Sequence, residues 1–472
     1  MAKKTFIAEQ VRITGIAEKG RGVGRDAEGR VFFVDNTVPG DVVNVLTLRK
    51  KKGFFEGVVH AVLESSPERV QPFCRHFDLC GGCSWQHLDY AAQLHHKQLM
   101  VENALLRIGK LEVEDFQPIT GADPNVYYRN KLEFSFSNRR WLTKEEVDSE
   151  VTNLEDVLGF HKSGAFDKAI DIEHCWLQPD PSNAIRLAAK RIAVAQGLAF
   201  WDARDNKGFV RNLMLRVATT GQVMALMSFS ENRKKAIPVF LDALHEACPQ
   251  ITSLYYCINH KVNDFMFDLD MILYRGEPAI EEQLGHVRCR IGPKSFFQTN
   301  TRQAKVLFDT AAEFAGLQGH ENVYDLYTGI GSIALYLAGR CRQVTGIEEI
   351  AAAIDDARDN AALNGIDNCT FYAGDVKDML TPEFAEKHGK PDVLITDPPR
   401  AGMHPKVVDI LLELAAPRIV YVSCNAATQA RDLQLLSAKY RVLKVRPVDM
   451  FPHTHHVESV ALLELSGVSG DG

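Results

Sequence analysis

The chain has 472 residues, 46% of them hydrophobic and 24% charged, and its 54 Lys and Arg against 61 Asp and Glu give a formal net charge of −7. This length and average composition predict about three globular domains and exclude a fibrous or disordered protein. No apolar run approaches the roughly 18 residues of a membrane span, and the start has no apolar signal core. We therefore expect a cytoplasmic protein that does not enter a membrane.

The first 65 residues are predicted to form a small β-barrel, because short β-rich runs alternate with glycine turns. Up to Arg69 this segment has 12 basic and 9 acidic residues, so it carries about +3 and the remainder about −10. The basic run 49–52 lies beside Phe54 and Phe55, a combination suited to phosphate contact and base stacking. A solvated hairpin tip is the simpler interpretation of the run taken alone.

The three remaining segments have different sequence patterns. Residues 66–90 are rich in cysteine, and apolar periodicity predicts a helix from about 90 to 108. Residues 91–290 are expected to form a central α+β unit of antiparallel strands, with helices near 181–196 and 235–246. Residues 291–472 alternate near-continuous apolar strands with helices, a pattern typical of a doubly wound parallel sheet. Ligands of such sheets bind at the carboxyl ends of the strands.

A glycine turn after the first of these strands indicates a nucleotide-like cofactor. The run DLYTGIGS (325–332) joins a strand to a helix, where glycines let the backbone approach a ligand. Glu348 closes the second strand, where a carboxylate can accept both ribose hydroxyls, and Asp375 follows the third, near an adenine. The dinucleotide pattern GxGxxG is absent. These features resemble the S-adenosylmethionine-dependent methyltransferase fold.

The following two strands end in residues with catalytic potential. The motif DPPR (397–400) and the sequence SCN (423–425) should reach the same edge as the cofactor turn, and Glu458 enters the last strand. A thiolate that adds to carbon 6 of uracil makes carbon 5 nucleophilic, and a base must later remove the carbon 5 proton. Cys424 suits the first role and Glu458 the second, while Asp397 could accept a hydrogen bond from uracil N3–H.

In this order and spacing, SFFQTN, DLYTGIGS, ITDPPRAG, VSCN and HHVES resemble the RNA 5-methyluridine methyltransferase family. The resemblance covers essentially the whole chain. It implies the following roles: cofactor contact by Gln298, Tyr327, Glu348 and Asp397, with Asp375 near the adenine; Cys424 as nucleophile; Glu458 as general base; Phe296 and Asp397 at the target base. Ser332 and Ala426 depart from the pattern, which affects finer contacts only.

Four cysteines form a candidate cluster site. Cys74, Cys80 and Cys83 have the spacing C-x5-C-x2-C, and Cys175 lies far downstream. Four thiolates could bind zinc or an iron–sulfur cluster. His76 and His87 are further possible ligands, although they are also typical of an exposed loop. The spacing resembles the [4Fe-4S] motif of the ribosomal branch of the family.

The resemblance also suggests the substrate. The amino-terminal barrel resembles a TRAM domain, and relatives that combine it with the cluster methylate 23S rRNA, at uridine 747, uridine 1939 or both. We therefore expect an RNA (uracil-C5)-methyltransferase acting on 23S rRNA, with a monomer as the working expectation for its oligomeric state. There are three alternatives. The protein could methylate another rRNA or tRNA uridine, it could methylate an exocyclic amino group through DPPR, or it could bind RNA in assembly without catalysis.

Overall fold

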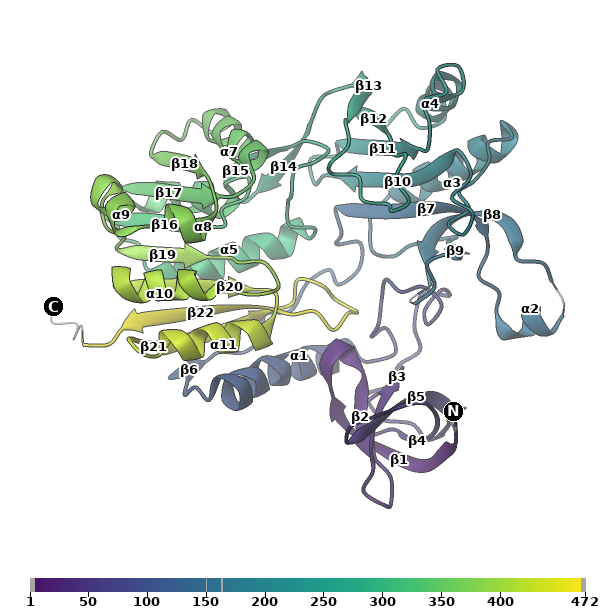
Figure 1. The fold of residues 1–472 in the computed structure, drawn as a ribbon, viewed down its shortest axis with the longest axis horizontal. Helices are drawn as coiled ribbons and strands as arrows, with labels where there is room; N and C mark the ends of the chain where they lie inside the picture. Colours follow the sequence, from purple (N-terminus) through teal and green to yellow (C-terminus); the bar gives the residue numbers. More distant parts are fainter. Residues whose placement is uncertain (1–4, 150, 163, 468–472) are drawn as a thin grey trace.

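The computed structural model describes residues 5–149, 151–162 and 164–467. Figure 1 shows three bodies: an amino-terminal barrel, a central sheet with its helices, and a larger sheet that carries the carboxyl-terminal part of the chain. Within the described ranges, no helix combines the length and the apolarity that crossing a membrane requires.

Five strands close into the barrel in the order β1-β2-β3-β5-β4. Alternate residues point inward, so that Val11 and Ile13 of β1 meet Phe32 and Val34 of β3 in one small core. A closed barrel leaves no unpaired strand edge. The barrel predicted from the sequence is confirmed. Its strands are β1 (Ile7–Ile16), β2 (Gly22–Arg25), β3 (Val31–Asp35), β4 (Val42–Lys51) and β5 (Phe54–Glu64), with a 3₁₀ turn at Glu18–Gly20.

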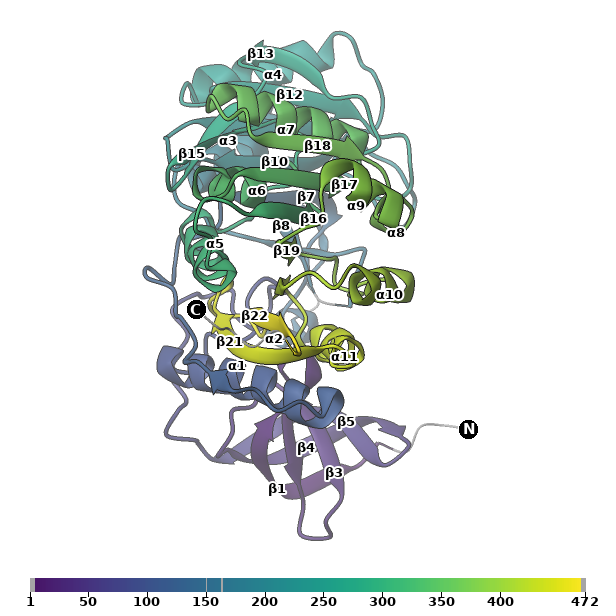
Figure 2. The same ribbon diagram turned by 90° about the vertical axis from the view of Figure 1, so that its left-hand side faces the viewer.

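The cysteine segment leads from the barrel into helix α1 (Tyr90–Ala104), which ends in a π-helical turn at Leu105–Gly109. The Asp89 side chain caps α1 by accepting hydrogen bonds from the first free backbone N–H groups. Helix α1 lies between the larger sheet and the barrel in both ribbon views (Figure 1, Figure 2). Strand β6 (Asp115–Phe116) pairs with β21 (Tyr440–Val448) at the edge of that sheet. Residues 91–116, which the sequence pattern grouped with the central unit, therefore pack on or pair with the larger sheet.

The central unit is a seven-stranded sheet in the order β13-β12-β11-β10-β7-β8-β9. The expectation of purely antiparallel strands is wrong for one pair, since β11 and β12 are parallel. The connection between them contains α4, which is long enough to cross over the sheet. The elements are β7 (Lys131–Arg139), α2 (Lys144–Asp148), β8 (Leu154–His161), β9 (Ala169–Asp171), α3 (Ser182–Ala195), β10 (Val210–Val217), β11 (Val223–Phe229), α4 (Ala236–Ala247), β12 (Ser253–Ile258) and β13 (Ile272–Gly276).

A hairpin, β14 (Ile280–Leu284) and β15 (Val287–Ile291), leads into the larger, eight-stranded sheet of order β18-β17-β16-β19-β20-β22-β21-β6. Its further elements are α5 (Thr301–Ala315), β16 (Asn322–Leu326), α6 (Ser332–Leu337), a 3₁₀ turn (Ala338–Arg340), β17 (Gln343–Glu348), α7 (Ala351–Leu363), β18 (Cys369–Ala373), α8 (Val376–Met379), α9 (Pro382–His388), β19 (Val393–Thr396), α10 (Pro405–Leu414), β20 (Arg418–Ser423), α11 (Ala426–Leu436), β21 (Tyr440–Val448) and β22 (Glu458–Leu465).

Helices cover both faces of this sheet. Neighbouring residues of β16, Val323 and Tyr324, point into two different cores, which explains why the strand sequences are apolar without alternation. The chain starts in the middle, at β16, and proceeds first to β17 and β18 and then to β19 on the other side. The strand order therefore reverses between β16 and β19, and ligands of open α/β sheets bind at this point.

Candidate active site

The turn between β16 and α6 has a strained backbone. Tyr327, Gly329 and Gly331 have φ angles of 63°, 56° and 80°, all in the left-handed region. A Cβ atom at Gly331 would lie 3.1 Å from the Phe371 ring, whereas one at Gly329 would meet no atom within 4 Å. A tyrosine in this region is uncommon, and such strain concentrates at functional sites. The turn thus leaves open space over Gly329 at the start of a helix, where a ligand can bind.

The buried Asp325 side chain holds this turn in shape through two hydrogen bonds. It is 1% exposed, and its Oδ2 atom accepts hydrogen bonds from the Thr328 hydroxyl at 2.5 Å and from the Ala334 backbone N–H at 3.1 Å. Burial raises the pKa of Asp325 to about 7, against the effect of these two hydrogen bonds. Its Oδ1 atom has no hydrogen-bond partner in the described chain. The sequence marked Asp325 only as the acid at the end of the first strand, and it was not among the candidate site residues.

Two of the expected cofactor acids face the turn. The Glu348 carboxylate accepts hydrogen bonds from the Gly329 backbone N–H at 3.1 Å and from the Ile350 N–H at 3.0 Å. Asp375 caps α8, and its hydrogen bond with Lys377 lowers its pKa. Burial raises the pKa of Tyr327 to about 12, and the nearby charges of Asp375 and Glu348 act in the same direction. Tyr327, Glu348 and Asp375 therefore surround one turn.

The strand register brings the two candidate catalytic residues together. Cys424 directly follows β20, and Glu458 is the first residue of β22. The two strands are antiparallel, and their last paired residues are Ser423 and Ser459. One further step along this ladder places position 424 opposite position 458. Asp397 directly follows the neighbouring strand β19, so all three residues lie at the cofactor edge.

The charges at this edge are strongly coupled. Glu458 is 5% exposed, and burial followed by the charge of Asp397 raises its pKa to about 8. Burial also raises the pKa of Asp397 to about 7, and burial followed by Glu458 raises that of the Cys424 thiol to about 11. Arg400 opposes the shifts of both Cys424 and Glu458. It was missed as a functional residue, although its place directly after DPP was the available signal.

The raised pKa values predict how the unfolding free energy depends on pH. A carboxyl whose pKa is about 8 in the folded protein and near 4 in the unfolded chain binds its proton more tightly when folded. Its stabilisation is complete below pH 4 and is lost as the pH rises through 8. We therefore expect the free energy of unfolding, measured with urea, to fall between pH 6 and 9 by on the order of 2 kcal/mol more in the parent protein than in Glu458→Gln.

The matched control for this measurement is Glu464→Gln, at the other end of the same strand. This residue is only partly buried, and its variant should follow the parent protein across the pH range. Equal pH slopes for Glu458→Gln and the parent would contradict the prediction.

The loop before Glu458 is fixed by a buried ion pair. Lys97 of α1 and Asp449 are both fully buried, with Nζ 2.6 Å from Oδ1, and Lys97 also donates to the Phe451 carbonyl at 3.0 Å. Gln93 of α1 accepts a hydrogen bond from the His453 backbone N–H at 2.9 Å. Breaking a buried pair of this kind is costly, because it leaves one charge without compensation. Helix α1 thus holds the segment that carries the candidate base.

Phe296 and Gln298 lie on a separate segment between β15 and α5. Phe296 is 69% exposed, and the preceding residue, Ser295, is held by hydrogen bonds to Asp356 and from the buried Arg216. Within the described chain, neither side chain forms a hydrogen bond to Cys424, Glu458 or Asp397. The structure thus presents Phe296 as an exposed aromatic side chain on a firmly supported loop.

The four clustered cysteines converge although Cys175 lies far downstream in the sequence. Cys74, Cys80, Cys83 and Cys175 all line one small cavity of about 30 Å³. Burial raises the pKa of Cys80 and of Cys83 to about 12, and the other cysteines contribute to both shifts. Among the residues that the structure describes, no group of three or more His, Cys, Asp or Glu side chains is arranged to hold a single metal ion.

The two candidate histidines, His76 and His87, line different cavities. His76 lines the cysteine cavity, and its Nε2 atom already accepts a hydrogen bond from the Glu173 N–H at 3.0 Å. His87 lines a different cavity.

The strand order, the strained turn after the first strand and the acids after the second and third strands define a Rossmann-like S-adenosylmethionine-dependent methyltransferase. Residues 279–466 match the model of the tRNA (uracil-5-)-methyltransferase family. An uncharacterized RNA methyltransferase of Bacteroides thetaiotaomicron is 50% identical over 95% of this chain and 100% of its own length. One of Chlorobaculum tepidum is 39% identical over 96% of both chains. The chain belongs to the RNA uracil-5 methyltransferase family and is an RNA methyltransferase.

A solved structure shares the whole architecture. The tRNA (uracil-54, C5)-methyltransferase of Pyrococcus abyssi, in complex with S-adenosyl-L-homocysteine, is 29% identical to this chain. The similarity covers 96% of this chain and 100% of the other, with a TM-score of 0.74. The fold class predicted from the sequence is thereby confirmed.

Proposed function

We propose that this protein methylates carbon 5 of a specific uridine in 23S rRNA through a covalent intermediate between Cys424 and the base. The observation that carries this proposal is the placement of Cys424 opposite Glu458 by the register of β20 and β22, at the edge that carries the cofactor turn. A thiol and a carboxyl group in one half-buried site are the two groups that carbon 5 methylation of uracil needs.

The residues around the turn after β16 suit S-adenosylmethionine. The open space over Gly329 would admit a ligand, and each Glu348 oxygen that accepts one backbone hydrogen bond retains a lone pair for a ribose hydroxyl. We assign Tyr327, Glu348 and Asp375, with Gln298 and Asp397, to cofactor binding. When bound, S-adenosylmethionine supplies an electrophilic methyl group.

The chain's own residues then perform the remaining chemistry. The Cys424 thiolate forms a bond to carbon 6 of uracil, and the electron pair of the 5,6 double bond moves toward carbon 4 as an enolate that is nucleophilic at carbon 5. After carbon 5 has been methylated, Glu458 removes its proton, the 5,6 double bond re-forms, and the bond between sulfur and carbon 6 breaks. Arg400 is the nearby cation that can favour the thiolate. We assign recognition of uracil N3–H to Asp397 and contact with the target nucleotide to Phe296.

We propose rRNA as the substrate class because the barrel and the cysteine spacing resemble the ribosomal branch of the family. The solved tRNA enzyme, which matches 96% of this chain, supports a tRNA uridine as the second candidate. We propose that the protein acts as a monomer in the cytoplasm, where both RNAs are available.

Methylation of deproteinised 23S rRNA and of bulk tRNA with methyl-labelled S-adenosylmethionine would decide between the two substrates. We expect label in 5-methyluridine of 23S rRNA at a single position. Label in tRNA alone would overturn the substrate assignment, and labelled methyladenosine or methylguanosine would overturn the chemistry. No transfer to either RNA, together with tight RNA binding, would favour the noncatalytic assembly role.

We further propose that the four cysteines hold a [4Fe-4S] cluster. Their side chains line one cavity, and four cysteine thiolates are the ligands that such a cluster needs. Burial raises the pKa of the Cys80 and Cys83 thiols, and bound iron would stabilise them as thiolates. The cluster would link the segment 74–83 to Cys175 of the central unit.

Anaerobic purification should yield a coloured protein with about four iron atoms per chain. Cys175→Ala is expected to lose the colour and most of the iron, because a cluster bound by three ligands is labile. The matched control is Cys248→Ala, a buried cysteine in the same unit but outside the cavity, which should keep both. About one zinc ion per chain and no iron would refute the assignment.

A further inference from the structure

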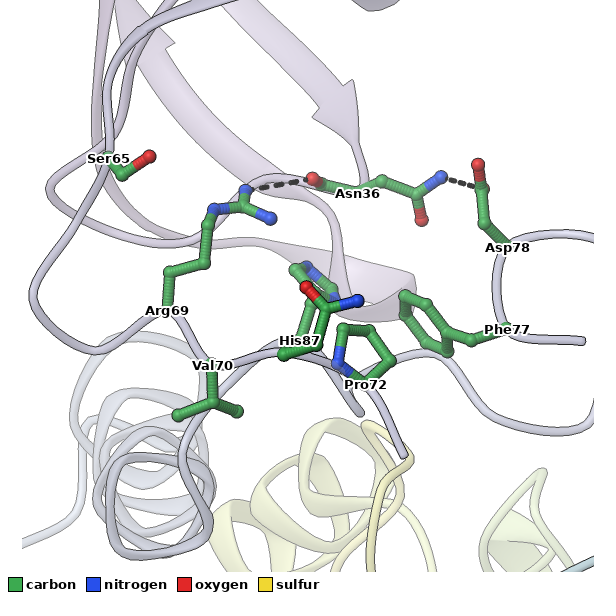
Figure 3. A pocket seen from close by; sticks show the side chains of 9 residues that line it. Asn36, Ser65, Arg69, Val70, Pro72, Phe77, Asp78 and His87 are labelled. Atoms are coloured by element: carbon green, nitrogen blue, oxygen red, sulfur yellow. Dashed lines mark hydrogen bonds between the residues drawn. The ribbon is translucent and has the colours of Figure 1, made fainter. Parts of the chain in front are cut away.

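A second cavity lies where the barrel meets the cysteine segment (Figure 3). Its volume of about 410 Å³ falls within the range of about 300–1,000 Å³ that is typical of small-ligand sites. The walls come from the turn after β3, the end of β5, the extended segment 69–72, the loop between Cys74 and Cys80, and His87. The proposed catalytic residues do not line it, and the proposed function gives it no role.

His87 is a buried polar side chain that points to a ligand here. It is 4% exposed, it lines the cavity, and neither ring nitrogen has a hydrogen-bond partner within the described chain. The Thr37 backbone lies near enough to affect the ring, but not in hydrogen-bond geometry. Burial, reinforced by Arg69, lowers the pKa of His87 to about 4, so the ring is neutral and offers one donor and one acceptor. Buried polar groups without partners are rare in folded proteins.

The cavity holds one paired cation, Arg69, and one carboxylate, Asp78. The Arg69 guanidinium lies 2.5 Å from the fully buried Asp41 carboxylate and donates to the Asn36 carbonyl at 3.2 Å. The Asn36 amide donates in turn to the carboxylate of Asp78, an exposed residue (Figure 3). Because its cation is paired and a carboxylate is present, the cavity does not suit a free phosphate. It suits a neutral ligand with both donors and acceptors.

Two aromatic rings that pack on each other and a proline line the cavity. The Phe77 and His87 rings lie 5.2 Å apart between centroids, with a tilt of 38°, and Pro72 adds a further apolar wall. Unpaired RNA bases are bound in this way, by stacking on aromatic side chains and by hydrogen bonds at their edges. The exposed Gln71 amide can supply such bonds at the rim.

The cavity is connected to the active site through a short stretch of chain. Trp85, two residues before His87, donates from its indole to the Gly20 carbonyl of the barrel at 3.0 Å and from its backbone N–H to the His453 carbonyl at 2.9 Å. Gly20 also packs directly against His455, three residues before Glu458. The segment below the cavity therefore supports the loop that leads to Glu458.

We propose that this cavity binds one unpaired base of the RNA substrate, at a position other than the methylated uridine. The proposal rests on the RNA substrate of the proposed function but not on its covalent mechanism. His87 and the rim amides would read the edge of the base, and Phe77 would stack on its face.

The test is fluorescence anisotropy with a labelled RNA: the rRNA or tRNA fragment that binds the parent protein most tightly, whether or not it is methylated. His87→Phe keeps a ring of similar size but removes both nitrogens, and we expect it to weaken binding about tenfold. Gln71→Ala alters an exposed residue that should not affect folding, and we expect it to weaken binding about threefold. His245→Phe, on α4 of the central unit, should bind like the parent.

A second series of RNAs carries a single abasic site at each position in turn. One position other than the target should weaken binding to the parent at least fivefold and have no further effect on His87→Phe, since both changes remove the same contact. Parent-like binding by both His87→Phe and Gln71→Ala, or equal losses at every abasic position in parent and variant, would overturn the proposal. Adduct formation at Cys424 is scored separately, so failure of the covalent mechanism would leave this result intact.

Discussion

Cys424→Ala is expected to lower the rate of uridine methylation by on the order of 10⁴-fold or more, the scale seen when an enzyme loses its nucleophile. Without the thiol, carbon 5 of uracil cannot be activated, although the RNA and S-adenosylmethionine can still bind. RNA that contains 5-fluorouridine should trap the parent protein as a covalent adduct, because fluorine at carbon 5 cannot leave as a proton does. The same variant should form no adduct, because it lacks the thiol. Denaturing electrophoresis of the protein with labelled RNA measures the adduct, and transfer of labelled methyl groups measures the rate.

Cys369→Ala is the matched control, because Cys369 is a partly buried cysteine at the start of β18 in the same sheet. It should retain both activity and adduct formation. If Cys424→Ala forms the adduct as well as the parent does, another residue is the nucleophile and the proposed mechanism is wrong.

Glu458→Gln is expected to stop the reaction after methylation, with the RNA still attached to Cys424. The amide cannot remove the carbon 5 proton, so the thiolate cannot leave. We expect turnover to fall by about 10²–10⁴-fold, the usual contribution of a general base. A stable complex with ordinary, unfluorinated RNA should accumulate to about one per enzyme, seen by denaturing electrophoresis and by mass spectrometry as methylated nucleotide on the Cys424 peptide.

Glu464→Gln, at the far end of β22, should turn over normally and accumulate no such complex. Slow turnover of Glu458→Gln without an accumulated adduct would assign Glu458 to an earlier step, such as thiol activation. That result would leave Cys424 as nucleophile and would place the base elsewhere.

Much of the catalytic sheet was predictable from local sequence. The apolar strands and glycine turn of residues 322–332 predict a parallel sheet with a ligand at its carboxyl edge, because each feature depends only on neighbouring residues. The same logic placed Glu348 and Asp375, which follow successive strands. It failed for β11 and β12, whose parallel pairing depends on how far the connecting helix reaches.

The electrostatics of the site could not be predicted from sequence. The pKa of Glu458 near 8 arises from its 5% exposure and the charge of Asp397, and both depend on packing between distant segments. The support of its loop by Lys97 joins residues 352 positions apart. No local pattern reveals such a pair, because in the sequence a buried lysine cannot be distinguished from a lysine on the surface of a helix.

By itself the sequence determined the composition of the site: a cysteine, a glutamate, a glycine turn and four clustered cysteines in a recognisable order. Only the tertiary structure decided which of them meet, because strand register sets Cys424 opposite Glu458 and chain folding brings Cys175 to the segment 74–83. It also created the cavity at His87, which has no motif because five separate segments form its walls.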